Sequence, residues 1–364
     1  MKTLKRALTI LTLGIFILPL TACVDRSWAL KADDVTISTG EYVFYLMEAY
    51  QAANNKLAEK GISTTNLSEE TIDEKSAPDW IVSKALDSCK EKIAIEQLFK
   101  EKGLELTEEE LKKADESTNS IWESAGSMYE RNFGINKDAV HQAYSLVNAK
   151  REKLFMSYYG KDGSEAIADE DIAKYYKENY ISLKFYAKMP TTEASIENES
   201  ADENAENKEE KKVETDESIQ KQFNEYVEAI NNGTKNIDQI RDSIKANEKI
   251  EGEHEPLIEQ TINLASPSFP QEIVDAVKDL AVGKATQVKF NDAYFFMYKS
   301  AAGDTITVPD LNNETERSRI LYDMKTEDFD QKIQAVTARL NISINYNAVN
   351  QYDPIVLGQN MIQG

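Results

Sequence analysis

Apolar residues recur at helical spacing through most of the first half of the chain. After a brief strand pattern at Val35–Ser38, the spacing predicts helices from Tyr42, over Trp80–Lys102, from Thr107, over Lys137–Gly160 and from Asp169. Thr107 is followed three residues later by Glu110, the combination that forms a capping box at a helix start. Residues 40–180 are therefore predicted to be predominantly helical.

The pattern changes to period two at Tyr180–Lys188, where Ile181, Leu183 and Phe185 alternate with polar residues. This alternation is typical of a half-buried strand. Later predicted elements are helices at Ser218–Ile230 and Ile237–Ala246, a strand at Leu257–Ile262, a helix after Pro270, a hairpin turning at Asn291-Asp292, a helix over Asn313–Leu340 and a final strand at Ile342–Tyr346. The second half of the chain therefore mixes strands with helices.

The first residues have the composition of a secretory signal. A basic start, MKTLKR, precedes an apolar run, Ala7–Leu20, that is shorter than the ~20 residues needed to span a bilayer. An uncleaved anchor helix is the alternative. The run ends in Leu20-Thr21-Ala22-Cys23, which resembles the lipobox of bacterial lipoproteins, whose cysteine is acylated and becomes the mature N-terminus. We therefore predict a lipoprotein signal peptide at 1–22, lipidation at Cys23, and an extracytoplasmic protein anchored by lipid to the bacterial cell membrane.

The chain is strongly acidic, which bears on its partners. It has 42 basic and 64 acidic residues and a net charge of −22, so nucleic acid is not an expected partner. Residues 191–217 contain eleven acidic residues, three lysines and no aromatic residue. Such a segment cannot bury enough apolar surface to offset its chain entropy, and it is predicted to be a disordered acidic insertion.

Cysteine and histidine give no sign of a metal or redox centre. Beyond Cys23 the only cysteine is Cys89, which lies within an apolar helical stripe and is predicted to be a buried small side chain. The two histidines, His141 and His254, are far apart in the sequence and lack metal-ligand spacing. No metal and no cofactor are expected.

The order of elements from Tyr180 to Lys299 is strand, two helices, strand, helix, strand, strand. Together with the phrase FPQEIVDAVKDLAVGKATQVKFNDAYFFMYK, this order resembles the parvulin-type peptidyl-prolyl isomerase domain. The helical part before it, with one strand near each end of the mature chain, resembles the SurA/PrsA class of extracytoplasmic foldases. The resemblance implies an α+β protein in which a helical domain is interrupted by a four-stranded parvulin-like module.

The implied boundaries follow from this resemblance. They are a linker at 23–34, a helical SurA-N-like chaperone domain at 35–178 completed by 305–350, the parvulin-like module at 179–302 carrying the acidic insertion, and a C-terminal tail at 351–364. In the foldase class the C-terminal segment completes the N-terminal domain. We therefore expect the final strand to pair with Val35–Ser38.

The resemblance also locates a candidate peptide-binding pocket. Active parvulins carry a histidine in their first strand and another in their last, and these positions fall at Lys184 and Phe295. The apolar proline pocket of the family maps to Phe269 and Ile273. Alternation along the strand puts Lys184 on its polar, solvent-facing side. The polar part of the isomerase site is therefore predicted to be degenerate, and no catalytic residue is assigned.

These features favour a membrane-anchored chaperone that binds unfolded or partly folded secreted proteins. An active parvulin-type prolyl isomerase with an altered site is one alternative. A solute-binding lipoprotein of a transporter is another, since it shares the lipobox and the size, but such proteins alternate strands and helices throughout. The long helical region at 40–180 favours the foldase interpretation.

Overall fold

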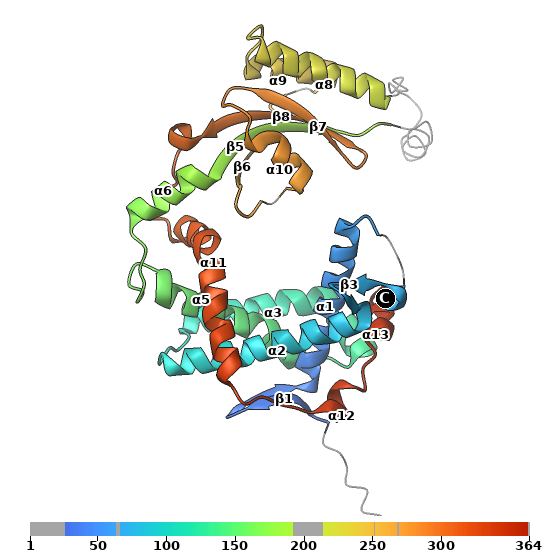
Figure 1. Cartoon of the computed structure of the whole chain (residues 1–364), viewed down its shortest axis with the longest axis vertical. Coiled ribbons are helices and arrows are strands. Elements are labelled where there is room, and N and C mark those ends of the chain that lie inside the picture. Colours follow the sequence, from blue (N-terminus) through green and yellow to red (C-terminus); the bar gives the residue numbers. More distant parts are fainter. Residues whose placement is uncertain (1–25, 63–65, 192–213, 251, 268, 363–364) are drawn as a thin grey trace, which may run out of the picture. The chain divides into compact units, whose positions relative to one another are not determined.

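The computed structural model describes residues 26–62, 66–191, 214–250, 252–267 and 269–362. The described chain divides into two compact units (Figure 1). Unit 1 holds the residues up to Glu152 together with those from Ile333 onward, and unit 2 holds Lys153–Lys332. Helices combined with small antiparallel sheets confirm the predicted α+β class. Among the described residues, no helix is both long and apolar enough to cross a membrane. Cys23 lies outside the described residues.

Unit 1 is mainly helical and carries a three-stranded antiparallel sheet. Its elements are β1 (Trp28–Ala32), β2 (Val35–Ser38), α1 (Thr39–Glu59), the 3₁₀ turn η1 (Leu67–Glu69), β3 (Thr71–Ile72), β4 (Lys75–Ser76), α2 (Ala77–Glu101), α3 (Glu108–Met128), the π-helical turn η2 (Tyr129–Phe133), α4 (Lys137–Val140), the π-helical turn η3 (His141–Ser145), β9 (Ser343–Ile344), α12 (Tyr346–Val349) and α13 (Pro354–Ile362). The division between the units falls within α5 (Leu146–Tyr159) and α11 (Glu314–Arg339).

Side-chain caps explain where several of these helices begin. The capping box predicted at Thr107 and Glu110 is present at the start of α3. A second one starts α1, where the Ser38 hydroxyl accepts from the Glu41 backbone N–H and the Glu41 carboxylate accepts from the Ser38 N–H. The helix predicted from Trp80 starts earlier, at Ala77, because the Ser76 hydroxyl caps it by accepting from the Asp79 N–H.

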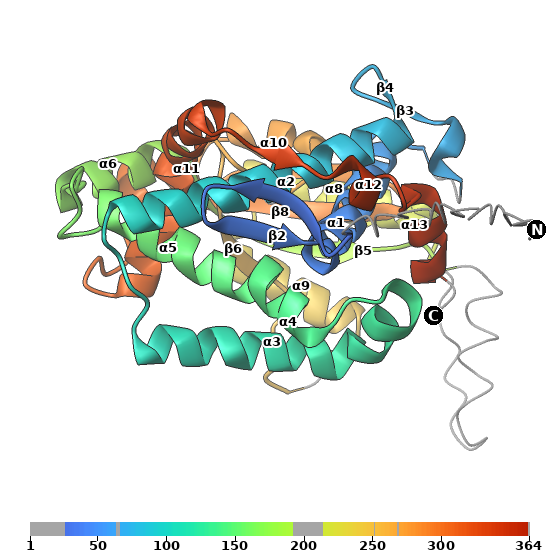
Figure 2. The same ribbon diagram turned by 90° about the horizontal axis from the view of Figure 1, so that it is seen from below.

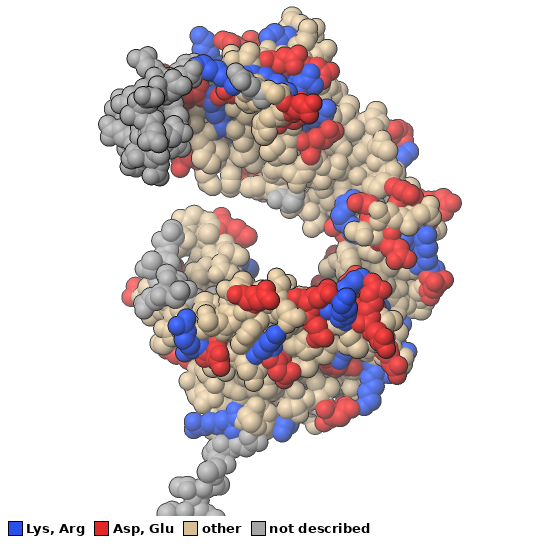
Figure 3. Space-filling model, turned by 180° about the vertical axis from the view of Figure 1, so that it is seen from behind, with Lys and Arg blue, Asp and Glu red and all other residues tan. Residues whose placement is uncertain are grey.

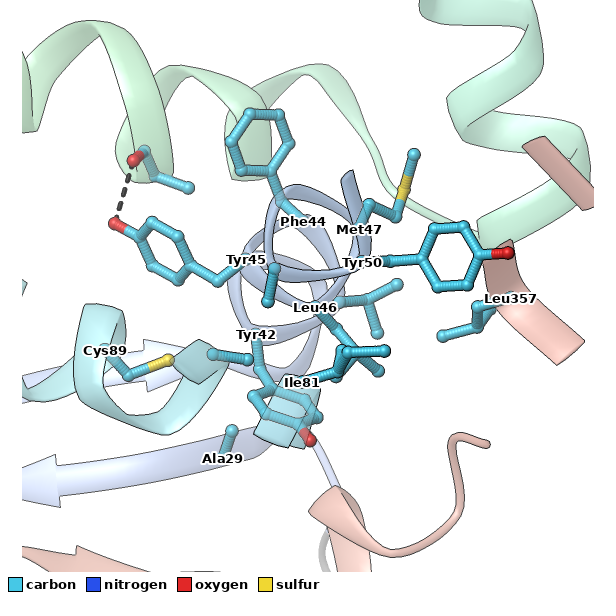
Figure 4. Close-up of a cluster of buried hydrophobic side chains, with 14 of the residues drawn as sticks. Ala29, Tyr42, Phe44, Tyr45, Leu46, Met47, Tyr50, Ile81, Cys89 and Leu357 are labelled. Carbon is cyan, nitrogen blue, oxygen red and sulfur yellow. Dashed lines mark hydrogen bonds between the residues drawn. The ribbon is translucent and has the colours of Figure 1, made fainter. Parts of the chain in front are cut away.

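The core of unit 1 surrounds α1, whose side chains point in several directions. Figure 4 shows Tyr42 extending from one side of the helix and Phe44 and Met47 from the opposite side. The Tyr45 hydroxyl donates to the Ala143 carbonyl at 2.8 Å. Cys89 is free and fully buried, as predicted, and burial raises the pKa of its thiol. This cysteine is therefore part of the packing.

The two ends of unit 1 differ from the sequence prediction. Residues 28–32, expected in a linker, form strand β1, which pairs with β2 and lies beside it in Figure 2. The C-terminal strand β9 pairs with β1, so the expected pairing of β9 with Val35–Ser38 is wrong. The segment expected to be a tail forms helix α13, and its Ile355 and Leu357 are buried in the core of unit 1.

Unit 2 is built on a four-stranded antiparallel sheet in the order β6-β5-β8-β7, which confirms the predicted strand number. Its elements are α6 (Asp169–Asn179), β5 (Tyr180–Lys188), α8 (Asp216–Asn231), α9 (Ile237–Asn247), β6 (Ile258–Asn263), α10 (Gln271–Lys278), β7 (Ala285–Phe290), β8 (Ala293–Ala302) and the 3₁₀ turn η4 (Gly303–Thr305). Figure 1 shows α8 and α9 on one face of the sheet and α10 on the other. Asn291 takes a positive φ in the predicted β7–β8 turn.

Residues at both ends of the acidic insertion belong to the folded part of unit 2. The Thr191 N–H donates to the Glu214 carbonyl at 3.0 Å, and the Glu214 N–H donates to the Thr191 hydroxyl at 2.9 Å. Lys188 forms ion pairs with the carboxylates of Glu214 and Glu248. Thr215, expected within the insertion, caps α8. Residues 192–213, the rest of the predicted insertion, lie outside the described residues.

Two shortened variants should show that residues 214–217 contribute to stability and that residues 192–213 do not. Replacing residues 192–213 by eleven Gly and Ser residues should change the free energy of unfolding by less than ~1 kcal/mol, because halving the length of a loop alters its closure entropy by only about 0.6 kcal/mol. Deleting 191–217 also removes the Thr215 cap, and it should cost about 1–2 kcal/mol more. Urea unfolding of both variants measures the difference. Equal stability of the two variants would contradict the assigned role of residues 214–217.

Candidate functional site

The face of the unit 2 sheet that α10 covers is lined by apolar side chains. Because side chains alternate along a strand, every second residue of β5 and β8 points to this face. We call the set the α10-side cluster. Its buried members are Ile181, Leu183, Phe185, Ile262, Ile273, Val277 and Met297, and its partly buried rim consists of Leu264, Phe269, Val288, Phe290, Phe295 and Ala302.

The structure brings three of the four predicted pocket residues into this cluster. Ile273, on α10, is only 1% exposed and lies at the centre. Phe269, just before α10, packs edge-on against Phe185 with ring centroids 5.5 Å apart. Phe295, on β8, is partly buried at the rim. Residues distant in sequence therefore form one apolar surface, and its role as a peptide-binding pocket stays a prediction.

Lys184, the fourth predicted residue, is not part of the α10-side cluster. It lies between Leu183 and Phe185 on β5, so its side chain points to the opposite face of the sheet. Its partner across the ladder is Tyr298, which packs on the α8 and α9 side. Its ammonium lies 3.7 Å from the Glu259 carboxylate, and its side chain is 31% exposed. Lys184 and Phe295 therefore lie on opposite faces of the sheet.

Lys299 is a buried charged residue near the α10-side cluster, and its burial was not predicted from the sequence. Lys299 is 3% exposed, and its ammonium donates to the Lys278 carbonyl at 2.8 Å, in the last turn of α10. Burial lowers the pKa of Lys299. A cation at the C-terminal end of a helix interacts favourably with the helix dipole. Lys299 therefore serves to fix the end of α10 against β8. Its sequence signal, one lysine within a strand of apolar residues, is too weak to show this.

The chemistry available on the α10-side cluster is apolar contact. Sequence reasoning did not assign Phe185 and Met297 to the site, although the strand alternation that places them was visible. Both side chains are buried beneath the rim, so contact with another chain falls to the partly buried rim residues such as Phe269 and Phe295. Among the described residues, no group of three or more acidic, histidine or cysteine side chains could hold a metal ion.

No family model matches the chain, and no curated protein matches it. Among solved structures, the foldase protein PrsA of Lactococcus lactis matches with a TM-score of 0.34 and 11% identity, over 88% of this chain and 96% of that one. PrsA of Streptococcus pneumoniae matches with a TM-score of 0.33 and 15% identity, over 80% and 97%. A SurA-like chaperone of Campylobacter jejuni matches with a TM-score of 0.24 and 12% identity, over 88% and 99%. These are the two kinds of protein that the sequence resembles.

Proposed function

We propose that the protein is a membrane-anchored extracytoplasmic chaperone that binds unfolded or partly folded secreted polypeptides. The observation that carries this proposal is the meeting of Phe269, Ile273 and Phe295 in one cluster with a partly exposed apolar rim. An unfolded chain exposes apolar side chains, and burying them against such a rim is favourable by about 25 cal/mol per Å² of apolar surface. The α10-side cluster is the proposed contact surface for these clients.

We further propose that the isomerase site is degenerate. Prolyl isomerisation must lower an amide barrier of ~18–20 kcal/mol, which requires a site that twists the bond. At the two positions where the family has histidines, this chain has an apolar Phe295 and a Lys184 that faces away from the cluster. Apolar walls without that polar pair support binding of an extended segment without efficient catalysis.

Two assays on the purified protein test this proposal together. It should suppress aggregation of an unfolded client at equimolar concentration, yet barely accelerate a refolding reaction limited by proline isomerisation. Catalysis at parvulin-like rates would favour the active isomerase instead. Absence of any effect on aggregation would rule out the chaperone function.

Truncating Phe269 on the apolar rim should weaken client binding more than removing the Lys184 side chain. Phe269→Ala is expected to weaken client binding roughly five- to thirtyfold, as is typical when a contact aromatic is removed. Lys184→Ala should weaken client binding less than about twofold, because Lys184 lies on the other face of the sheet and its ion pair with Glu259 is partly exposed. Fluorescence anisotropy with a labelled unfolded client gives both affinities, and circular dichroism checks that each variant is folded. Equal effects of the two substitutions would contradict the proposed surface.

The proposed anchor is the lipid on Cys23. It rests on the Leu20-Thr21-Ala22-Cys23 motif directly after the apolar run. Two or more acyl chains suffice for stable anchoring, since each buried CH₂ contributes ~0.8 kcal/mol. The proposed location is therefore extracytoplasmic, with the protein anchored by lipid to the bacterial cell membrane.

A further inference from the structure

A hollow beside α1 in unit 1 combines aromatic walls with a carboxylate that pairs with no described residue. The hollow encloses about 300 Å³ and is lined by Phe44, Met47, Glu48, Gln51 and Tyr129, among others. The Phe44 ring lies edge-on to Tyr129 with centroids 6.0 Å apart, and edge-on to Tyr144 at 6.2 Å. Figure 4 shows Phe44 and Met47 on the same side of α1. The hollow therefore has a fixed apolar wall on one helix.

Within the part of the chain that the structure describes, Glu48 has no ion-pair partner, whereas carboxylates on the neighbouring helix α2 have one. Acidic and basic side chains are interspersed over the surface shown in Figure 3. On α2, Glu91 pairs with Arg151 and Glu96 pairs with Lys150. Glu48 also lines a second hollow beside Arg151, yet it forms no ion pair or hydrogen bond with any described residue.

The surroundings of Glu48 limit which occupants would fit the hollow. Its side chain reaches solvent, but the protein atoms around it raise the pKa of its carboxyl. Its negative charge in turn contributes to a raised pKa of Tyr129, which is due first to burial. A purely apolar occupant would cover this carboxylate without pairing it, and an unpaired covered charge is unfavourable. A single carboxylate also offers too few oxygen ligands for Ca²⁺ or Mg²⁺. A cation with an apolar stem fits both parts of the hollow.

We propose that this hollow binds a lysine or arginine side chain of a client polypeptide. The aliphatic stem lies against Phe44, Met47 and the Tyr129 ring, and the cationic head reaches Glu48. Long cationic side chains bury their stems on apolar surface while the head stays at a polar partner, and aromatic rings attract the cation. The net charge of −22 favours such clients further. This site rests on the proposed chaperone function and deepens it by adding a preference for basic residues.

Labelled unstructured peptides that differ in one residue test the site on the full purified protein. One peptide carries a central lysine flanked by leucines, and its match carries ε-acetyl-lysine at that place. The lysine peptide should bind about three- to fivefold more tightly, as expected for one ion pair with an aromatic contact. Glu48→Gln should abolish this difference. Glu59→Gln, an exposed carboxylate on the same helix outside the hollow, should preserve it.

Methyl NMR with ¹³C-methionine locates the contact. The lysine peptide should shift the Met47 methyl signal, assigned by its loss in Met47→Leu. Equal affinity for both peptides, a preference that survives in Glu48→Gln, or an unmoved Met47 signal would each overturn the site. If aggregation suppression persists in any of these cases, the site fails and the chaperone function stands. If the protein neither binds peptide nor suppresses aggregation, both fail.

Discussion

Lys92→Met is expected to destabilise unit 1 by about 3–5 kcal/mol, the usual cost of leaving one member of a buried ion pair without its partner. The Lys92 ammonium contacts the Glu41 carboxylate, and the two side chains are only 5% and 6% exposed. Glu41 also accepts the Ser38 N–H at 2.7 Å in the capping box of α1. Removing Lys92 therefore leaves a buried charge at the start of the central helix.

The chain offers a clean measurement and two controls for this prediction. All three tryptophans, Trp28, Trp80 and Trp122, lie in unit 1, so tryptophan fluorescence during urea unfolding reports on this unit. Adding Glu41→Gln to Lys92→Met should recover most of the loss, because glutamine keeps the cap without the charge. Lys113→Met, which breaks an exposed pair with Glu109 on α3, should cost less than about 0.5 kcal/mol. A loss no larger than this control would refute the prediction.

The buried pair also shows what an apolar pattern misses. The stripe of α2 includes Ile81, Cys89 and Ile93, and all three are buried as the spacing predicts. Lys92 lies on the same buried face of α2, although a prediction from the spacing of apolar residues alone places a lysine on the surface. Its burial depends on Glu41, 51 positions away. Only the tertiary structure supplies such a partner.

Elements with local signals were predicted well, and long-range pairings were not. The capping box of α3 and the β7–β8 turn depend on adjacent residues, so the sequence contains their cause. Strand β9 has only two residues, and its pairing with β1 depends on contacts between the two ends of the chain, which are far apart in the sequence. The pattern at Trp28–Ala32 is too short to stand out from a linker. Helix α13 was missed for a similar reason, because it is held by a long-range contact with α1. Its Gly358 lies directly against the ring of Tyr50 on α1.

For the candidate site, too, local patterns were predictable from the sequence and the relative positions of distant residues were not. Alternation in β5 and β8 was visible in the sequence, and it explains why Phe185 and Phe295 reach the α10-side cluster. The mapping of Lys184 and Phe295 onto the two family histidines came from resemblance, which fixes no register. In the sheet the two residues point to opposite faces. A one-residue difference in register is enough to exchange the faces of a strand.

Cys23→Ala is expected to remove the acyl label and to leave the protein unprocessed or released from the membrane. The thioether-linked lipid needs the thiol of Cys23, and alanine provides no such group. Alanine carries no acyl chain, so any variant protein that is cleaved at this place should lose membrane association almost completely, whereas an unprocessed precursor keeps its apolar run but carries no acyl label. Cys89→Ala is the matched control, because it removes the other cysteine, which is buried in α2. Metabolic labelling with an alkyne fatty acid, followed by membrane fractionation in a bacterial host, measures both properties. Label and membrane association should persist in Cys89→Ala. Persistence of both in Cys23→Ala would show that the anchor lies elsewhere in the chain.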